Sequence, residues 1–398
     1  MLRERNYVLL SMSAFSANFG SVALLMSLSL KAFAQTGSSL LAGAIYGSQW
    51  LIPLFFLPMI GWLANRYPLR RLMSVTLVLS VAVTVVVCQC YPHYLLPFFG
   101  LMAVRGVLEN VSKSAAAVAL KVYMPGRLLE RASSFYDTNR YVSSATASLV
   151  GVLFLNRISI AQVALLSSSA FVIAACCYAA LPYVPAVKPD QPRPDFSYWR
   201  ETWRILERKP LLRRCFVNLS LITGVFQGFY YIARSTLPIG QLGLSINAAA
   251  FVQALISLTF TAGAMFVARF MPVGAPPLRW LSPLVQTVAA AFFMAGSVLT
   301  RQPVFGIASF LACLFFYEVY YTFTNNQIML TCTPEEISYI SSAKYGALTF
   351  CMLVVIVAGG AAADAIGFAS MTLVLAWSVV IGFYIFNNRL LPESSEVV

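Results

Sequence analysis

Long apolar runs recur along almost the whole chain, and only short polar segments separate them. An α-helix needs about 20 apolar residues to cross the hydrocarbon core of a bilayer, and a segment in lipid must satisfy its own backbone polar groups. Only 10% of the 398 residues are charged and 59% are hydrophobic, whereas a soluble domain has about 25% charged residues. The chain is therefore expected to be an all-α, multi-pass membrane protein without a large soluble domain.

Twelve of these runs are long enough to be transmembrane helices. They are expected at residues 7–33, 40–63, 72–91, 94–122, 133–155, 160–181, 211–239, 248–270, 278–300, 304–329, 340–363 and 368–386. The longest polar break falls between the sixth and seventh runs. It predicts an N-terminal six-helix bundle over residues 1–184, a cytoplasmic linker over 185–210, and a C-terminal six-helix bundle over 211–398.

The second half of this linker has a helical pattern. Trp203 and Leu206 share one face, and arginines stand four residues apart at positions 200, 204 and 208. Such a pattern is typical of a basic helix that lies on the inner leaflet, with a solvated linker as the alternative.

The chain has a net charge of +13, and the distribution of its lysines and arginines indicates how it is oriented in the membrane. With a cytoplasmic amino terminus, most lysines and arginines fall on the cytoplasmic side, as the positive-inside rule requires, so nucleic acid is not expected as a partner. Both termini are then cytoplasmic, and a bacterial inner membrane is the expected location. The eight cysteines lie in or beside apolar runs without metal-binding spacing, so no metal or other cofactor is expected.

Three charges stand inside the fourth predicted span. Arg105, Glu109 and Lys113 are four residues apart and therefore share one helical face. A charge at mid-bilayer costs from about 2.5 to more than about 10 kcal/mol, so it rarely faces lipid. This face is expected to border a bundle interior or a water-filled cavity.

The two halves carry acids in the same register. Glu109 and Glu318 each stand sixteen residues before a loop proline, Pro125 and Pro334. We interpret the two acids as pseudosymmetric partners across a central cavity.

The segment Gly61-Trp-Leu-Ala-Asn-Arg-Tyr-Pro-Leu-Arg-Arg-Leu-Met73 lies in the predicted turn between the second and third spans. Its glycine is expected to permit close helix packing, and its arginines to hold the turn at the anionic leaflet. The segment resembles the loop signature of the major facilitator superfamily. The resemblance implies a cytoplasmic gate loop that includes Gly61, Asn65, Arg66, Arg70 and Arg71. Asn65 replaces the acid of the signature, which removes a charge that could pair with the arginines.

The resemblance also implies a role for Arg105, which is similar to the fourth-helix arginine implicated in proton transfer in this family. Within the superfamily, the Asn18-Phe-Gly-Ser21 segment resembles exporters of siderophores and macrolides. Ser21 stands where those exporters often have an acid, and the fifth span lacks the proline of the antiporter signature.

Intramembrane ionisable groups are the best candidates for ion coupling. The predicted charge network consists of Arg105, Glu109, Lys113, Asp137, Arg140, Glu318 and Lys344. Glu109 has a cation one turn away on either side and is expected to act as a counter-ion. Glu318 is expected to be the proton carrier. The alternative is that these charges only pair to hold helices together.

Polar side chains at helical spacing predict a solute cavity. The candidates are Asn18, Ser21, Gln227, Tyr230, Tyr231, Arg234, Gln253, Tyr317, Tyr321 and Asn325. Hydroxyls and amides can replace a solute's hydration shell, although they can also be interhelical contacts worth about 0.6 kcal/mol each.

The sequence contains no nucleotide-binding loop or hydrolase motif, so an enzyme is not expected and an ion or solute gradient must drive transport. The expected function is proton-coupled export of a siderophore-like or drug-like organic molecule, by alternating access in a monomer. Proton-coupled uptake of an anionic nutrient, siderophore or cell-wall fragment is the alternative on the same fold. A lipid scramblase or membrane sensor is the alternative of another class.

Overall fold

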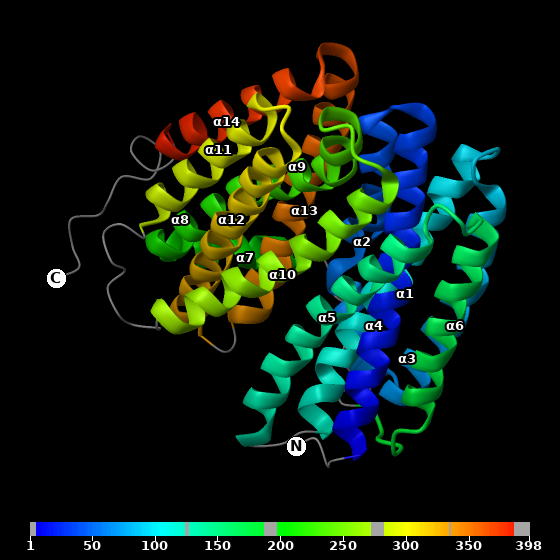
Figure 1. The fold of residues 1–398 in the computed structure, drawn as a ribbon. Coiled ribbons are helices and arrows are strands. Elements are labelled where there is room, and N and C mark those ends of the chain that lie inside the picture. Colours follow the sequence, from blue (N-terminus) through cyan, green and yellow to red (C-terminus); the bar gives the residue numbers. More distant parts are fainter. Residues whose placement is uncertain (1–4, 124–126, 187–196, 272–281, 334–335, 386–398) are drawn as a thin grey trace. The chain divides into compact units, whose positions relative to one another are not determined.

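The computed structural model describes residues 5–123, 127–186, 197–271, 282–333 and 336–385, and these residues are almost entirely helical, without a β-strand among them (Figure 1). The first half of the chain forms α1 (Arg5–Thr36), α2 (Ser39–Arg66), α3 (Leu69–Cys90), α4 (Leu95–Tyr123), α5 (Arg127–Phe154) and α6 (Ile160–Ala179). Each helix coincides with one predicted span, because apolar length sets where a membrane helix forms.

The second half begins with the linker helix α7 (Ser197–Arg208). It continues with α8 (Pro210–Asn218), α9 (Gly224–Ser235), α10 (Ile246–Phe270), α11 (Pro283–Leu299), α12 (Pro303–Thr331), α13 (Glu336–Ile366) and α14 (Phe368–Ile385). The span predicted over 211–239 is present as one helical segment, Pro210–Gln241, but π-helical segments at Leu219–Thr223 and Thr236–Gln241 flank α9 within it. Extra residues per turn rotate the following side chains, so a strict 3.6-residue pattern does not hold across this stretch.

Ten helical segments of the described chain are long and apolar enough to cross a membrane. They are Arg5–Thr36, Ser39–Arg66, Leu69–Cys90, Leu95–Leu120, Ile160–Ala179, Pro210–Gln241, Ile246–Val267, Pro303–Thr331, Ala343–Ile366 and Phe368–Ile385. The apolar helix α11 is shorter, and α5 is not among the ten. The count of twelve crossings therefore stays a prediction.

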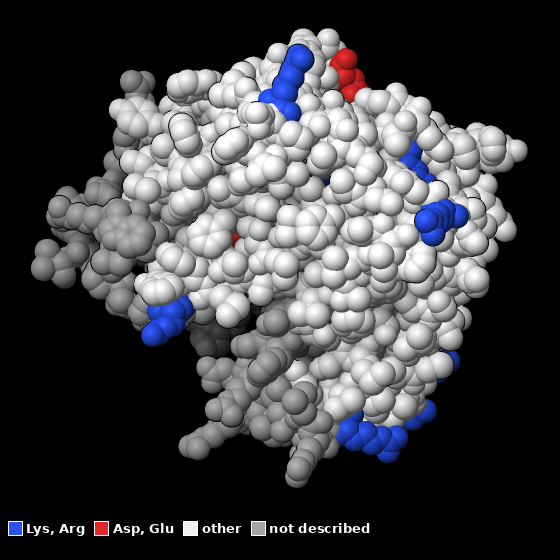
Figure 2. Space-filling model, viewed as in Figure 1, with Lys and Arg blue, Asp and Glu red and all other residues white. Residues whose placement is uncertain are grey.

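The described surface suits contact with lipid tails. On the face in Figure 2 most of the surface is uncharged, and charged side chains appear in a few isolated places. Large apolar side chains such as Phe55, Leu96 and Val304 are more than two-thirds exposed. In a soluble protein so many exposed apolar groups would be an aggregation hazard, whereas lipid solvates them.

The chain divides into two compact units that do not follow the sequence halves completely. Unit 1 consists of residues 1–31, 45–194 and 246–258, and unit 2 consists of residues 32–44, 195–245 and 259–398. The first turns of α2 thus belong to unit 2, and the first half of α10 belongs to unit 1. The predicted bundle boundaries at 184 and 211 remain predictions.

Small residues bring the helices of unit 1 together. One buried cluster combines side chains of α1, α3, α4 and α6, including Leu10, Met73, Ala119 and Phe171. The tightest contact joins α4 to α2, because a Cβ atom on Gly106 would lie 1.8 Å from the carbonyl oxygen of Gln49. Only glycine allows the two backbones to approach this closely.

The linker helix α7 belongs to unit 2 and packs there through its apolar side. Ile205 and Leu206 join a buried cluster with Leu219, Ile328 and Ile340. Trp203, which the sequence pattern placed with Leu206, is 61% exposed instead. The packed side of α7 therefore includes Ile205 and Leu206 but not Trp203.

An ion pair joins the end of α7 to the start of α13. Lys209 Nζ lies 2.6 Å from Glu336 Oε2 and also donates to the carbonyl oxygen of Thr331. Glu336 Oε2 accepts a second hydrogen bond from the amide of Thr333. Glu336 lies before the apolar span Ala343–Ile366 of α13. The hydrogen bonds that it accepts from Lys209 and Thr333 lower its pKa. A lowered pKa in the folded state stabilises the fold above the unfolded-state pKa of about 4.3, and this stability is lost as the pH falls through the folded-state pKa.

Glu336→Gln is therefore expected to lower the Tm of the purified protein by about 1–3 °C at pH 7, since such pairs contribute about 1 kcal/mol. The difference from the wild type should shrink as the pH falls through the lowered pKa of Glu336, because the protonated glutamate is then as neutral as the glutamine. Glu201→Gln is the matched control, because the pair of Glu201 with Arg204 is more exposed. Differential scanning fluorimetry against pH measures the effect, and an equal Tm at pH 7 would contradict it.

Candidate functional site

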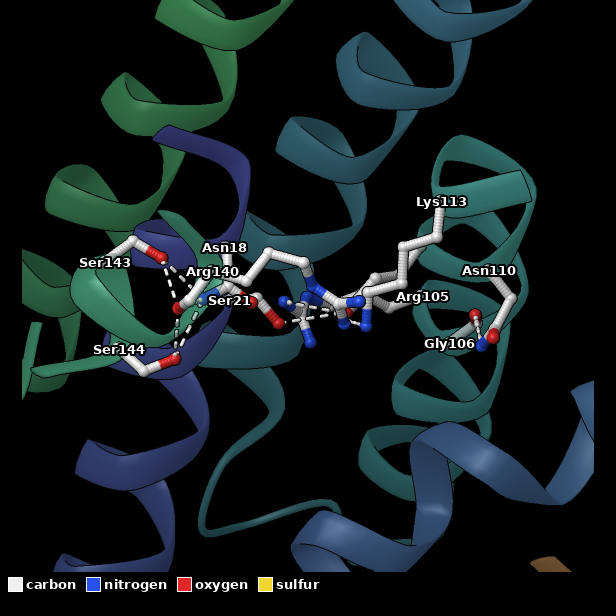
Figure 3. A network of polar contacts seen from close by, with 10 residues as sticks. Asn18, Ser21, Arg105, Gly106, Asn110, Lys113, Arg140, Ser143 and Ser144 are labelled. Carbon is white, nitrogen blue, oxygen red and sulfur yellow. Dashed lines mark hydrogen bonds and ion pairs between the residues drawn. The ribbon is translucent and has the colours of Figure 1, made fainter. Parts of the chain in front are cut away.

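The charged face of α4 forms a compact cluster in unit 1 (Figure 3). Glu109 Oε1 lies 2.5 Å from Lys113 Nζ, and Glu109 Oε2 lies 3.5 Å from Arg105 Nη2. Ser21 of α1 donates its hydroxyl to Glu109 Oε2 over 2.7 Å. One carboxylate therefore binds two cations of its own helix and a hydroxyl of its neighbour.

Arg105 is the most deeply buried charge of this cluster. It is 1% exposed, and its guanidinium carbon lies 5.5 Å from the centre of the Phe171 ring. Its Nε and Nη1 atoms are buried and have no hydrogen-bond partner among the described residues. A buried guanidinium with unused donors is unusual in a folded protein.

Lys113 lies closer to solvent. Its side chain is 32% exposed, compared with 18% for Glu109, and its ammonium lies 5.7 Å from the centre of the Trp50 ring. A cation over an aromatic face gains electrostatic stabilisation. Lys113 is thus the most exposed member of the cluster.

The amide of Asn18 connects α1 to α5. Its Nδ2 atom lies 2.8 Å from the carbonyl oxygen of Arg140, 2.6 Å from Ser143 Oγ and 2.9 Å from Ser144 Oγ. Figure 3 shows these groups beside the α4 cluster. In this structure Asn18 makes interhelical contacts, so its predicted role as a solute ligand remains a proposal. The side chain of Asp137, the other predicted charge of α5, lies outside the described residues.

The predicted carboxylate of unit 2 lies on α12. Glu318 is 6% exposed and accepts a hydrogen bond of 3.2 Å from the hydroxyl of Thr322. Gly263 of α10 lies against it, since a Cβ atom there would be 2.9 Å from Glu318 Cβ. The rings of Tyr317 and Tyr321 on the same helix stack with centres 6.4 Å apart. Glu318 is thus packed among helices, not exposed to lipid.

Two further predicted residues meet in unit 2. Lys344 of α13 is 2% exposed, and its ammonium donates a short hydrogen bond to Asn325 Oδ1 of α12. The same ammonium lies 4.5 Å from the centre of the Tyr345 ring. No carboxylate pairs with Lys344 among the ion pairs of the described residues, so a neutral amide and an aromatic ring surround this charge.

The predicted residues of α9 also belong to unit 2. Arg234 is buried with its guanidinium carbon 5.0 Å from the centre of the Tyr230 ring, and Tyr230 packs edge-on against Phe260. Gln227 is partly buried and Tyr231 is buried on the same helix. Gln253 of α10 is buried, but it belongs to unit 1. The predicted residues therefore gather into separate groups in the two units. The predicted relation of Glu109 to Glu318 across a cavity stays a prediction.

The predicted gate loop forms the turn between α2 and α3. Arg66, Arg70 and Arg71 are exposed there, and Arg66 lies 5.0 Å from the centre of the Trp62 ring. The packing role expected for Gly61 is wrong, because a Cβ atom there would meet nothing within 4 Å. Gly106 has that role instead.

Several residues at these sites were not predicted from the sequence. Trp50 and Phe171 contact the cations of α4 from other helices, and nothing in their local sequence indicates this. Asp364, near the end of α13, binds the start of α2. A Thr-Gly-Ser-Ser segment before an apolar run is a helix-start signal, and it could have prompted a search for a capping acid.

Comparisons with known proteins agree with this architecture. The family model of the Major Facilitator Superfamily matches residues 10–343. No curated protein sequence matches the chain significantly.

Three similar solved structures are all transporters. A mutant of the nucleoside transporter NupG has a TM-score of 0.79 and 13% identity, over 96% of this chain and 98% of that one. A POT family transporter in complex with a thioalcohol-conjugated peptide has a TM-score of 0.76 and 12% identity, over 96% and 95% of the chains. A bacterial homologue of the human lysosomal transporter Spinster has a TM-score of 0.72 and 13% identity, over 97% and 95%. At these identities the likeness establishes the fold alone.

The family match covers most of the chain, and the described helices are those of a multi-pass membrane protein. Charged groups buried among these helices suit a transporter of small molecules rather than a catalyst. This chain belongs to the Major Facilitator Superfamily of membrane transporters.

Proposed function

We propose that this protein is a proton-coupled secondary transporter that exports an acidic organic solute by alternating access. The observation that carries the proposal is the buried cluster of α4, in which Glu109 contacts both Arg105 and Lys113 while two guanidinium nitrogens of Arg105 lack partners. Two cations on one carboxylate leave an excess of positive charge in a membrane helix. A solute carboxylate or a chelating anion would neutralise this excess.

Proton coupling is assigned to Glu318. Its carboxylate is buried in a membrane-spanning helix and receives a hydrogen bond from a neutral hydroxyl, Thr322. A carboxylate buried in a membrane-spanning helix is a common site of proton uptake and release. Glu109 has cations on both sides and is proposed as a fixed counter-ion.

The direction of transport is proposed from the sequence resemblance to siderophore and macrolide exporters. Uptake of an anionic nutrient uses the same groups and is the second candidate. Everted membrane vesicles with an imposed proton gradient separate the two. An exported solute should accumulate in the vesicles, whereas an imported solute should be released from them.

Substrate class and coupling can be tested with proteoliposomes that contain a pH-sensitive dye. A panel of organic acids, including catecholate and hydroxamate chelators, is compared with the corresponding methyl esters and amides. Acids are expected to cause proton movement and their neutral derivatives are not. Equal responses to both would contradict the anionic class.

Glu318→Gln is expected to reduce solute-dependent proton movement to the background of empty liposomes, because an amide cannot carry the proton. Glu207→Gln, an exposed acid of α7, is the matched control and should keep wild-type activity. Proton movement that survives in Glu318→Gln would overturn the assignment of Glu318. Proton-independent movement of lipid in the same liposomes would instead favour a scramblase.

A further inference from the structure

The carboxylate of Asp364 holds the first turn of α2. Its Oδ1 atom accepts a hydrogen bond of 2.6 Å from the amide of Ser39, and its Oδ2 atom accepts one of 3.2 Å from the amide of Leu40. The hydroxyl of Ser38 donates to Oδ2 over 2.7 Å and accepts from the amide of Leu41. The first amides of a helix have no partner within the helix, and they favour a negative charge. Asp364 supplies hydrogen-bond acceptors and a negative charge to these amides from a segment more than 300 residues away in the sequence.

Close packing lies directly beneath this contact. Gly360 is one helical turn before Asp364, and a Cβ atom there would lie 2.8 Å from Leu40 Cα. A Cβ atom on Gly43 would lie 3.3 Å from Ile232 of α9 and 3.4 Å from Ile356 of α13. Gly43 and Gly360 therefore allow the start of α2 to pack closely against α9 and α13. The hydrogen bonds of Asp364 lie at the exposed end of this contact.

The first turns of α2 and the rest of this helix belong to different units. Residues 32–44 belong to unit 2, whereas α1 up to Lys31 and α2 from Ile45 belong to unit 1. The helix α2 is therefore shared between the units, and it contains Pro53 and Pro58, where helices bend most easily. A bend of α2 at these prolines would pull on its first turn, which the hydrogen bonds to Asp364 and the packing against Gly360 hold to α13.

We propose that Asp364 is a gating residue whose hydrogen bonds to residues 38–40 form a latch, and that this latch opens and closes in each transport cycle. In the predicted topology the latch lies at the external side, where the first span ends and the second begins. The contact itself does not depend on the proposed substrate or coupling ion. Its opening during transport rests on the proposed function.

The latch can be tested by disulfide formation between Leu40→Cys and Gly360→Cys in a variant without the eight native cysteines. A Cβ on residue 360 would lie 3.3 Å from Leu40 Cβ, close to the disulfide range of about 3.5–4.5 Å. The rate of oxidation is followed by the loss of free thiols. Asp364→Ala is expected to slow this rate by at least about fivefold, because the first turn of α2 would leave α13 more often. Asp364→Asn, which keeps an acceptor, should lie between the two.

The matched control is a pair inside unit 1, Gly20→Cys with Ala170→Cys, where the corresponding Cβ distance is 3.2 Å. Its oxidation rate should be the same with and without Asp364→Ala. An unchanged rate for the 40–360 pair would overturn the latch. An equal fall for both pairs would also overturn it, since Asp364 would then act on overall stability.

The same disulfide tests whether the latch opens during transport. Proteoliposomes with the oxidised 40–360 pair are expected to lose solute-dependent proton movement and to regain it after reduction. Undiminished movement in the oxidised protein would overturn the gating role even if the latch is present. If the reduced and wild-type proteins move no solute, the proposed function fails. The oxidation rates then still show whether Asp364 holds the first turn of α2 against α13.

Discussion

Glu109→Gln is expected to destabilise unit 1 more than the loss of any exposed charge. Glu109 is the carboxylate that contacts both Arg105 and Lys113, and Arg105 is almost completely buried. Removal of one member of a buried ion pair costs about 3–5 kcal/mol, because the remaining charge stays buried without a counter-ion. This corresponds to a fall in Tm of at least about 6 °C, with a matching loss of folded protein after detergent extraction.

A second variant separates the effect of charge from that of shape. In Glu109→Gln with Lys113→Met, one of the two uncompensated cations is removed, so about half of the lost stability should return. Lys113→Met alone should cost less than Glu109→Gln, since the ammonium is 32% exposed and Glu109 keeps Arg105. Glu201→Gln removes an acid from an exposed pair and should change the Tm by less than about 2 °C.

These variants are compared by thermal unfolding in detergent and by size-exclusion chromatography. A Glu109→Gln protein with the wild-type Tm would contradict the counter-ion role. A double variant as unstable as Glu109→Gln would show that the amide disturbs packing and that excess charge is not the cause.

Gly106→Ala is expected to prevent normal assembly of α2 and α4. The new Cβ would lie 1.8 Å from the carbonyl oxygen of Gln49 and 2.5 Å from its carbonyl carbon, and both are backbone atoms. No rotamer change relieves a backbone clash, so one helix would have to move. Overpacking in a well-packed core costs about 1–3 kcal/mol and occasionally more, and a backbone contact belongs at the upper end.

The same helix provides the control for this substitution. Gly100 also lies in α4, and a Cβ atom there would meet nothing within 4 Å. Gly100→Ala should leave the Tm unchanged or raise it slightly, because alanine favours a helix by about 1 kcal/mol over glycine. Fluorescence-detected size-exclusion chromatography of both variants compares their folded yields. If Gly106→Ala gives the same folded yield and Tm as Gly100→Ala, the close approach of α2 and α4 is not required for folding.

The sequence predicted the helical fold because apolar length is a local property. Each predicted span coincides with a helix or a run of helices, and the loop signature at 61–73 identified the family that the family model confirms. The contacts of Glu109 with Arg105 and Lys113 could also be predicted, since residues four apart meet on one helix whatever surrounds it. The π-helical segments around α9 were not predicted, because they depend on packing against other helices.

Contacts between distant segments had no signal in the sequence. Nothing near Phe171 shows that it lies beside Arg105, and nothing near Asp364 shows that it caps a helix more than 300 residues earlier. The sequence assigned close packing to Gly61, whereas the structure places it at Gly106.

The sequence by itself determined that this chain forms membrane helices, which of them carry charge, and which family it belongs to. Only the tertiary structure decided which charges are buried, which glycines are essential, and where the start of α2 is held. The physical reason is that hydrophobicity and helical periodicity act over a few neighbouring residues. Burial, close approach and capping by Asp364 depend on how helices far apart in the chain pack together.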